Sequence, residues 1–304
     1  MSLPVVLLSE PLPAVGMARL ASAPLEVRVL ERPTEAALAA ALPDADAVVL
    51  VNERPHLTAA MIAAAPRLRL ACRNGAGLDN FDADALAARG IPLVGTGDAN
   101  ADAVAEHALY LLLALFKRGP AYDRSVRAGM WQRRPDVREL RGRTAAVVGY
   151  GRIGRRIATL VRAFGMRVLA VDPSLSMNDG QIVACDLATA LAAADAVVLA
   201  LPLTPATRGL IDAPALALMK PDAVLVNVAR GGIVDQAALV AALRAGRLAG
   251  AGLDVLAVEP PSPDDPLLGR DDVVLSPHVA ASCPEAVDRV ALACADAVIA
   301  GLAR

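Results

Sequence analysis

The stretch that decides the fold is residues 144–164, TAAVVGYGRIGRRIATLVRAF. It opens with a short run of small and β-branched apolar residues, typical of a buried strand, and closes with residues at helical spacing. Gly149, Gly151 and Gly154 lie between the two in a G-x-G-x-x-G pattern. The first glycine permits a tight turn, the second lets the backbone approach a pyrophosphate, and the third lets helix and strand pack closely. The stretch therefore predicts a dinucleotide-binding βαβ unit.

The residues that follow extend the predicted cofactor site. Arg152 and Ile153 begin the helix, whose N-terminus offers N–H groups and a positive dipole end to an anion. The next apolar run, RVLAVD, ends at Asp172, eighteen positions after Gly154. A carboxylate at this place accepts hydrogen bonds from the adenosine ribose hydroxyls and repels a 2′-phosphate. The sequence thus predicts NAD rather than NADP as the cofactor.

Short β-rich runs alternate with Ala- and Leu-rich helical stretches on both sides of this unit. The first series has predicted strands at 4–9, 25–30, 47–51, 68–72 and 92–95, with helices at 34–42, 58–65 and 82–89. The second series has six predicted strands, at 144–149, 167–172, 195–201, 223–229, 250–255 and 273–276. Between the series we expect helices from 101 to about 130 and a polar loop at 131–143, and after them a last helix at 284–302. Short crossovers make both sheets parallel, so the chain is predicted to be α/β with two doubly wound sheets.

Composition limits the classes of partner. Hydrophobic residues make up 56% of the 304 residues and aromatics only 2%, so the core is built from Ala, Val, Leu and Ile. The net charge of −2 gives no electrostatic footprint for nucleic acid or an anionic membrane. The apolar run 109–116 is shorter than the roughly 20 residues of a membrane span. The apolar start lacks a basic n-region, so we interpret it as a strand and expect a cytoplasmic protein.

Four cysteines, Cys72, Cys185, Cys283 and Cys294, show no close-pair spacing for zinc. No metal site is predicted. Small buried thiols in a reducing compartment are the favoured interpretation.

The chain has three histidines, so the search for a proton carrier is short. His56 lies in a polar loop, NERPHLT, where we expect a solvated ring. His107 is a polar position within AVAEHALYLLLAL, and is predicted to form a structural or interdomain hydrogen bond. His278 follows the last strand in VVLSPHVAAS, at the sheet edge where α/β folds place their chemistry. It is the candidate acid or base.

At this point the chain resembles the D-isomer-specific 2-hydroxyacid dehydrogenases over nearly its whole length. The shared motifs, in family order, are GAGLDNFD at Gly75, AVAEHALYLLLAL at Ala103, GYGRIGRRIA at Gly149, LPLTPATRGLI at Leu201, NVARGGIVD at Asn227, GLDVLAVEP at Gly252 and SPHVAAS at Ser276. Two positions depart from the commoner pattern. Leu256 stands where many relatives have Phe, and Cys283 stands where Thr is usual.

The resemblance implies three catalytic residues in a hydride transfer between NAD(H) and a D-2-hydroxy acid/2-keto acid pair. His278 would protonate the keto oxygen in reduction and act as the base in reverse. Glu259 would pair with this histidine, favour its imidazolium form and orient the ring. Arg230 would bind the substrate carboxylate, a task that suits the planar guanidinium fork.

Further roles also come from the resemblance. Backbone N–H groups at Ala76 and Gly77 would bind the other side of the substrate carboxylate, and Asp254 would bind cofactor near the nicotinamide. A flavodoxin-like substrate domain would comprise residues 1–98 plus 276–304, with an NAD-binding Rossmann domain inserted at 99–275. Domain closure would expel water before hydride transfer. Relatives are mostly homodimers, and the apolar helix around 109–115 suits burial in such an interface.

Alternatives remain open at this level. A non-catalytic, NAD-sensing binding protein resembling co-repressors can retain the histidine, although we expect no partner-binding extension after the last helix. A formate dehydrogenase on the same fold would need additional active-site residues. Glyoxylate, hydroxypyruvate and 3-phosphohydroxypyruvate all share the 2-keto carboxylate. The distal pocket is expected at 52–57 and Arg73–Asn74, where Arg54 and Arg73 either bind a phosphate or are solvated.

Overall fold

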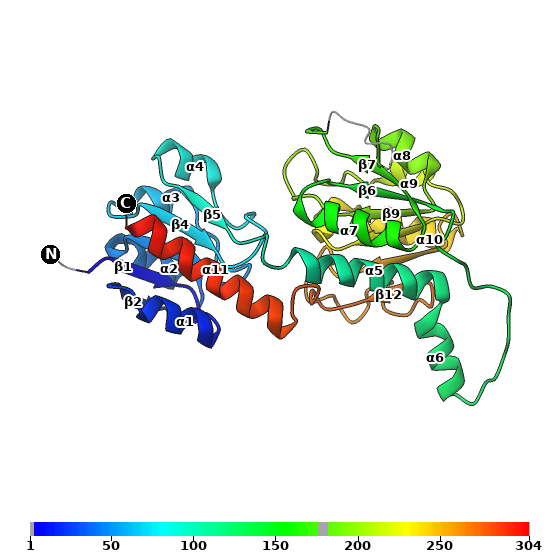
Figure 1. The fold of residues 1–304 in the computed structure, drawn as a ribbon, viewed down its shortest axis with the longest axis horizontal. Helices are drawn as coiled ribbons and strands as arrows, with labels where there is room; N and C mark the ends of the chain where they lie inside the picture. The colour runs from blue at the N-terminus through cyan, green and yellow to red at the C-terminus, as the bar shows by residue number, and fades with distance from the viewer. Residues whose placement is uncertain (1–2, 176–181, 304) are drawn as a thin grey trace. The chain divides into compact units, whose positions relative to one another are not determined.

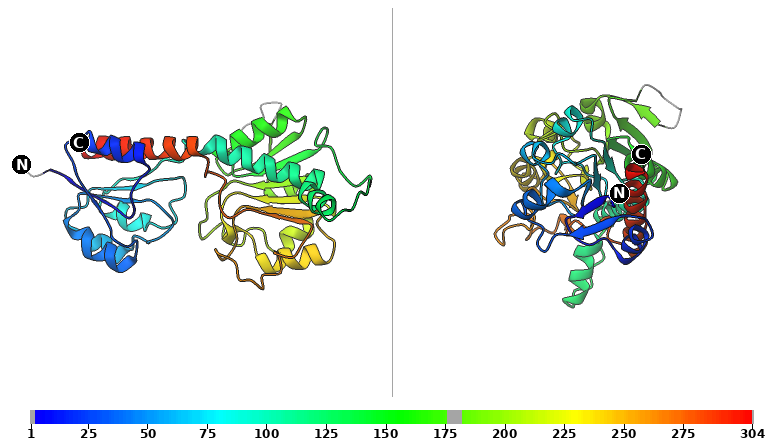
Figure 2. Two further views of the ribbon diagram at one scale, coloured as in Figure 1. Left: turned by 90° about the horizontal axis from the view of Figure 1, so that it is seen from below. Right: turned by 90° about the vertical axis from the view of Figure 1, so that its left-hand side faces the viewer.

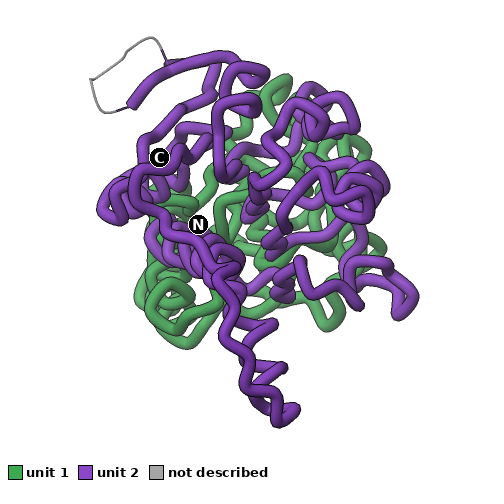
Figure 3. Tube along the Cα trace, turned by 90° about the vertical axis from the view of Figure 1, so that its right-hand side faces the viewer, with its two compact units in different colours: residues 1–100, 282–304 green, residues 101–281 purple. Residues whose placement is uncertain are grey.

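A computed structural model describes residues 3–175 and 182–303 of the chain. The chain divides into two compact units (Figure 3). Unit 1 comprises Met1–Asn100 and Ser282–Arg304, and unit 2 comprises Ala101–Ala281. Each unit has its own parallel sheet, covered by helices on both faces (Figures 1 and 2).

Unit 1 is built on a five-stranded sheet in the order β2-β1-β3-β4-β5. Its strands are β1 (Val5–Leu8), β2 (Glu26–Val29), β3 (Ala47–Leu50), β4 (Leu70–Arg73) and β5 (Leu93–Gly95). All pairs are parallel. The order 2-1-3-4-5 is that of flavodoxin-like folds, and all five strands coincide with predicted runs.

Helices cover both faces of the unit 1 sheet. One core lies beneath α1 (Ala14–Ala21) and α11 (Pro284–Leu302), which pack side by side (Figures 1 and 2). The other lies beneath α2 (Glu35–Ala41), α3 (Ala59–Ala63) and α4 (Ala83–Ala88). Each helix of the second group begins after a capping side chain: Thr34, Thr58 and Asp82 each accept a hydrogen bond from a first-turn N–H. Helix α1 was not predicted, because Pro13 precedes it without a side-chain cap.

Unit 2 is built on a seven-stranded parallel sheet in the order β12-β11-β10-β9-β6-β7-β8. Its strands are β6 (Thr144–Val148), β7 (Arg167–Val171), β8 (Ile182–Ala184), β9 (Ala196–Leu199), β10 (Val224–Asn227), β11 (Gly250–Leu253) and β12 (Val273–Leu275). The strand order reverses between β6 and β9, which is the topological switch point of a Rossmann fold. Six strands were predicted, and β8 was missed: it has three residues, of which only Ile182 is buried.

Helices cover the unit 2 sheet on both faces. On one face lie α5 (Ala101–Lys117) and α7 (Arg152–Ala163), and on the other α8 (Leu187–Ala193), α9 (Ala213–Leu218) and α10 (Gln236–Arg244). Helix α6 (Gly119–Arg127) buries no residue and projects from the end of α5 (Figure 1). Across the described part of the chain, we find no helix with the length and apolar character to span a bilayer.

The four cysteines are free thiols. Cys72 on β4 and Cys294 on α11 are fully buried, with their Sγ atoms 3.4 Å apart. Hydrogen bonding to Cys72, together with burial, raises the pKa of Cys294. Cys185 and Cys283 are only partly buried.

Candidate active site

The sequence-predicted residues of unit 2 gather at one edge of its sheet. Gly149, Asp172, Arg230, Asp254 and His278 lie one to three residues after β6, β7, β10, β11 and β12, respectively. Because all seven strands are parallel, these positions share the carboxyl edge. Open α/β sheets bind ligands outside this edge, beside the switch point.

The glycine-rich turn leaves room for an anion. Gly149 has a φ of +89°, and a Cβ on it would lie 2.4 Å from Ala200 O. A Cβ on Gly154 would lie 2.0 Å from Gly149 O, so both positions require glycine. A Cβ on Gly151 would meet no atom within 4 Å. Gly151 also supplies no side-chain cap to α7. Open space beside an uncapped helix N-terminus fits a pyrophosphate.

Asp172 joins the end of β7 to this turn. Its Oδ2 accepts a hydrogen bond from Tyr150 N at 2.8 Å, and its Oδ1 accepts from Ser174 N at 2.9 Å and Ser174 Oγ at 2.6 Å. The hydrogen bond from the Ser174 hydroxyl is the main cause that lowers the pKa of Asp172. A carboxylate has about four acceptor sites, so this ionised group keeps capacity for ribose hydroxyls.

His278 and Glu259 are in direct contact. His278 Nδ1 lies 2.8 Å from Glu259 Oε2, and Glu259 Oε1 accepts a hydrogen bond from Leu256 N at 2.8 Å. The carboxylate is therefore held from two sides and orients the imidazole through Nδ1. About one third of each side chain is exposed, 31% and 32%. Because Nδ1 faces Glu259, Nε2 is the ring nitrogen that would exchange a proton with a bound molecule.

Arg230 lies in a turn whose main chain is hydrogen-bonded to the side chain of Asn227. The buried Asn227 donates through Nδ2 to Arg230 O at 3.0 Å and accepts from Ala229 N at 3.0 Å. A Cβ on Gly231 would lie 1.9 Å from Leu256 O, so the Arg230 turn packs tightly on the segment that leads to Glu259. Sequence reasoning missed Asn227, for which its polar side chain at the end of a buried strand was the available signal.

Asp254 is the most deeply buried of the candidate charges, with 2% of its surface exposed. Its carboxylate accepts hydrogen bonds from Ser276 Oγ at 2.6 Å, Val279 N at 3.0 Å and Ala280 N at 3.0 Å. Burial opposes the charged form. Hydrogen bonds from His107, Ser276 and the two amides outweigh it and lower the pKa of Asp254 to about 2.

The unit 1 candidates lie in the loop after β4. Gly75 N donates to Thr96 Oγ1 at 2.9 Å, and a Cβ on Gly97 would lie 2.8 Å from the Ala76 Cβ. The backbone at Gly75 and Ala76, directly before Gly77, is therefore held against the segment that follows β5. These contacts give the loop a defined conformation within its own unit.

The arginines expected near the distal pocket differ from each other. Arg73 is 7% exposed and donates to Leu50 O at 3.2 Å and Asn74 O at 2.9 Å, so it braces the loop from inside. The expectation of a solvated Arg73 is therefore wrong. The Arg54 side chain is 77% exposed and lies 3.8 Å from Glu35. His56 is also exposed, with Nδ1 3.4 Å from Glu35 Oε1.

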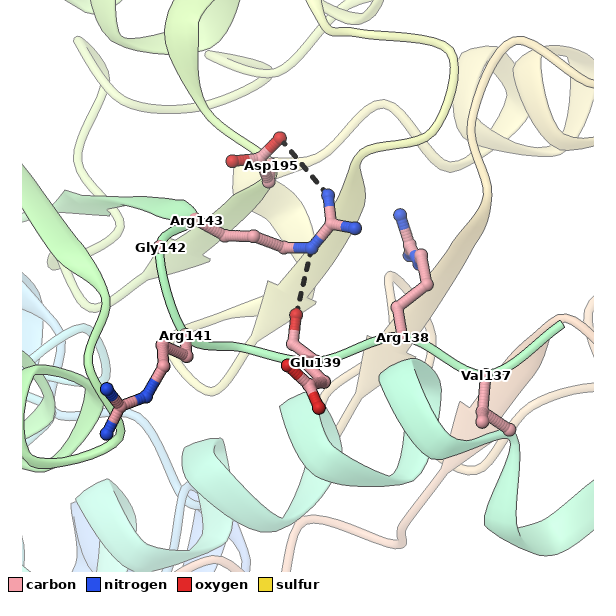
Figure 4. Close-up of a pocket in the computed structure, with 7 residues that line it drawn as sticks. All are labelled: Val137, Arg138, Glu139, Arg141, Gly142, Arg143 and Asp195. Carbon is pink, nitrogen blue, oxygen red and sulfur yellow. Dashed lines mark hydrogen bonds and ion pairs between the residues drawn. The ribbon is translucent and has the colours of Figure 1, made fainter. Parts of the chain in front are cut away.

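A separate hollow of about 560 Å³ lies in unit 2 (Figure 4). It is lined by residues 137–139 and 141–143 together with Asp195. Thr144 begins β6 and Ala196 begins β9, so the hollow lies at the amino edge of the sheet, opposite the candidate site. The positive charges of two of its arginines are balanced by ion pairs, because Arg143 Nη1 lies 3.7 Å from a carboxylate oxygen of Asp195 and Arg138 Nη1 lies 3.6 Å from one of Asp222.

Comparison with known proteins agrees with this geometry. Residues 109–280 match the family model described as D-isomer specific 2-hydroxyacid dehydrogenase, NAD binding domain. The D-3-phosphoglycerate dehydrogenase of Mycobacterium tuberculosis is 44% identical over 307 residues, covering 100% of this chain. The chain belongs to the D-isomer-specific 2-hydroxyacid dehydrogenase family.

Two further members differ in the substrate their names give. The hydroxypyruvate reductase of Thermotoga maritima is 37% identical over 254 residues, or 83% of each chain. The D-lactate dehydrogenase of Aquifex aeolicus, solved with NAD and lactic acid, superposes with a TM-score of 0.88 at 27% identity, covering 98% of this chain and 95% of the other. The present chain spans 58% of the length of the mycobacterial relative. Both sheets and their helices are those of this family's α/β fold, and unit 2 carries its NAD-binding domain.

Proposed function

We propose that the protein is an NAD-dependent dehydrogenase that interconverts a small D-2-hydroxy acid and its 2-keto acid. The observation that carries the proposal is the contact of His278 with Glu259, on a segment packed against the turn of Arg230. A proton carrier and a fork-shaped cation beside a nucleotide site are what reduction of a 2-keto acid requires. When bound, NAD(H) supplies or accepts the hydride.

The protein groups have distinct roles in this proposal. Arg230 binds the substrate carboxylate and polarises the adjacent carbonyl, and the amides of Ala76 and Gly77 bind the same carboxylate. His278 delivers a proton from Nε2 to the carbonyl oxygen in reduction and removes it in oxidation. Glu259 holds the ring through Nδ1 and balances the charge of the imidazolium.

The proposed cofactor site lies at the switch point of unit 2. Gly149, Gly151 and Gly154 shape the turn, and the N–H groups of Arg152 and Ile153 begin the helix that receives the pyrophosphate. We propose that Asp172 binds the ribose hydroxyls, which favours NAD over NADP because a 2′-phosphate would meet an ionised carboxylate. The proposed NAD-binding domain, residues 99–275, lies almost wholly within unit 2. The proposed substrate domain, residues 1–98 with 276–304, lies within unit 1 apart from the segment 276–281, which carries His278 and belongs to unit 2.

The substrate is proposed only as a class. The mycobacterial relative is named for 3-phosphoglycerate and the Thermotoga relative for hydroxypyruvate. The exposed Arg54 is the cation of the expected distal loop that is available to a phosphate. Arg73 is buried and its Nη1 donates to main-chain oxygens, so this proposal assigns recognition of a phosphorylated keto acid to the exposed Arg54.

We further propose a homodimer located in the cytoplasm. Leu111 and Leu112 of α5 are already buried within unit 2. These two residues therefore do not contribute to a dimer interface, although the sequence predicted that the helix around 109–115 would. Exposed apolar side chains lie instead at Tyr110, Val126 and Trp131, 53%, 48% and 76% exposed. Sedimentation equilibrium measures the mass directly. A cytoplasmic location agrees with two close thiols that remain unbridged.

The reaction is tested with a panel of keto acids. Glyoxylate, pyruvate, hydroxypyruvate and 3-phosphohydroxypyruvate are assayed with NADH and with NADPH by absorbance at 340 nm. We expect turnover with NADH and a lower kcat/KM with NADPH. His278→Asn, which tolerates the left-handed backbone at this position, is expected to lose about 10²–10⁴-fold in kcat. Arg230→Lys keeps the charge but loses the fork, so its kcat/KM falls steeply.

The matched control is Arg127→Lys, which alters an exposed arginine of α6 that pairs with Asp123 and leaves kcat unchanged. If the protein binds NADH but turns over none of the keto acids, the proposed function is wrong and an NAD-sensing binding protein becomes the better proposal. Equal use of NADPH would remove the proposed role of Asp172.

A further inference from the structure

The polar position on the apolar helix α5, His107, has no role in the proposed reaction. Its side chain is 17% exposed, and its Nε2 lies 2.8 Å from Ser276 Oγ and 3.3 Å from Asp254 Oδ1. Ser276 precedes His278 with only Pro277 between them. The contact therefore connects α5 to the segment that carries the proposed proton carrier.

The hydrogen bonds in this cluster run in one direction. The Ser276 hydroxyl has a single hydrogen and donates it to Asp254 Oδ1 at 2.6 Å. It must then accept from His107, whose Nε2 carries a hydrogen. The chain runs from His107 through Ser276 to Asp254, and it ends on a carboxylate that the surrounding donors keep ionised.

Asp254 also holds three successive amides of the segment. Its backbone oxygen accepts from His278 N at 2.8 Å, and its carboxylate accepts from Val279 N and Ala280 N, each at 3.0 Å. His278 has a φ of +53°, in the left-handed region that residues other than glycine rarely adopt. Such a conformation persists only where the surrounding structure determines it. Here the determining contacts converge on Asp254.

We propose that His107, Ser276 and Asp254 are positioning residues that fix the backbone of His278, so that its Nδ1 stays on Glu259. This inference rests on the proposed function and adds a positioning role to the cofactor contact that the family resemblance implies for Asp254. The Asp254 carboxylate is 1% exposed and is surrounded by its own chain's donors. It acts through the main chain of residues 278–280.

Kinetics test the positioning role. His107→Phe is expected to lower kcat about 10- to 100-fold, since a small misplacement of a reacting group costs that much, with NADH affinity unchanged because His107 is not among the proposed cofactor contacts. Asp254→Asn is expected to lower kcat by a similar factor. His107→Gln keeps an N–H donor and is expected to recover most of kcat. The matched control is Asp195→Asn at the opposite edge of the sheet. It removes a carboxylate, 13% exposed, that accepts from Thr144 N and pairs with Lys220, and we expect it to lower stability without lowering kcat.

A spectroscopic readout makes the test independent of turnover. The chain has only three histidines, so ¹⁵N-histidine labelling gives few ring signals, each assigned by deleting one histidine. We expect the His278 ring resonances to move in Asp254→Asn and His107→Phe, and to stay in place in Asp195→Asn, with those of His56 unmoved throughout. Weakened NADH binding with unmoved His278 resonances would overturn the inference in favour of a cofactor contact. Resonances that move as expected in a protein without turnover would support the positioning role and overturn the proposed function.

Discussion

At the scale of single residues, the charge on Asp254 links stability to pH. The donors around this carboxylate lower its pKa from 3.8 to about 2. A depressed carboxyl pKa stabilises the folded state above the unfolded-state value, and this contribution is lost as pH falls through the folded-state value. For a side chain this buried, the contribution at neutral pH is about 2 kcal/mol.

Asp254→Asn should therefore be less stable than the wild-type protein at pH 7 by at least about 2 kcal/mol. The gap in unfolding free energy should narrow as pH falls from 4 towards 2, because the wild-type carboxyl then takes up its proton. Urea unfolding at a series of pH values measures both. A gap that stays constant between pH 5 and pH 2.5 would contradict the buried, ionised state of this group.

Residue types at the site could be predicted better than the contacts that hold them. His278 stands out because it is one of three histidines and follows the last strand, whereas Glu259 and Arg230 were assigned from the family resemblance. The structure brings His278 and Glu259 into contact. Asn227 accepts a hydrogen bond from Ala229 N, two residues further along the turn. Asp254 accepts one from Val279 N, on the segment after β12. Periodicity and spacing report neighbours along one element and not across the sheet edge, so these roles became visible only in three dimensions.

At the scale of elements, the turn between β6 and α7 combines two kinds of glycine. Gly149 and Gly154 are required by the fold, because a side chain at either would overlap backbone atoms. Gly151 faces open space at φ −74°, so the fold itself does not require glycine there. The space beside Gly151 is where the proposed pyrophosphate binds.

Gly151→Ala is therefore expected to fold with an unchanged melting temperature and to bind NADH at least about tenfold more weakly, because a methyl group keeps the anion from the helix N-terminus. Fluorescence titration of NADH and calorimetry measure the two quantities. Gly119→Ala is the matched control, since its Cβ would also meet nothing within 4 Å, and it should change neither. Normal NADH affinity in Gly151→Ala would show that the pyrophosphate does not bind beside Gly151.

Element prediction succeeded where strands were buried and of ordinary length. Nine of the twelve described strands have four or five residues, and β5 and β12, with three each, lie in predicted runs. Strand β8 also has three residues, but one of them is exposed. Helix α1 was missed for a related reason, since no capping side chain marks its start. Both omissions are of elements whose stability comes from packing against neighbours rather than from local signals.

At the scale of the whole molecule, the chain builds unit 1 from two segments far apart in sequence. Helix α11 supplies Cys294, Ala295 and Val298 to the same core as Leu20 of α1. The cores of unit 2 contain no residue of this cluster. Damage to the unit 1 core should therefore stay within unit 1, although its residues come from both ends of the chain.

Leu20→Ala tests this independence. The side chain is fully buried, and removing it should destabilise unit 1 by about 2–5 kcal/mol. Calorimetry should then resolve an early transition for unit 1 and an unshifted one for unit 2. Near the midpoint of the early transition, keto-acid reduction should be lost while NADH binding persists, because the proposed nucleotide site lies wholly in unit 2. Leu292→Ala, at a 39% exposed position of α11, should leave both transitions in place. If both transitions shifted together in Leu20→Ala, the two cores would be a single cooperative unit, and the assignment of substrate and cofactor binding to separate domains would lose its thermodynamic basis.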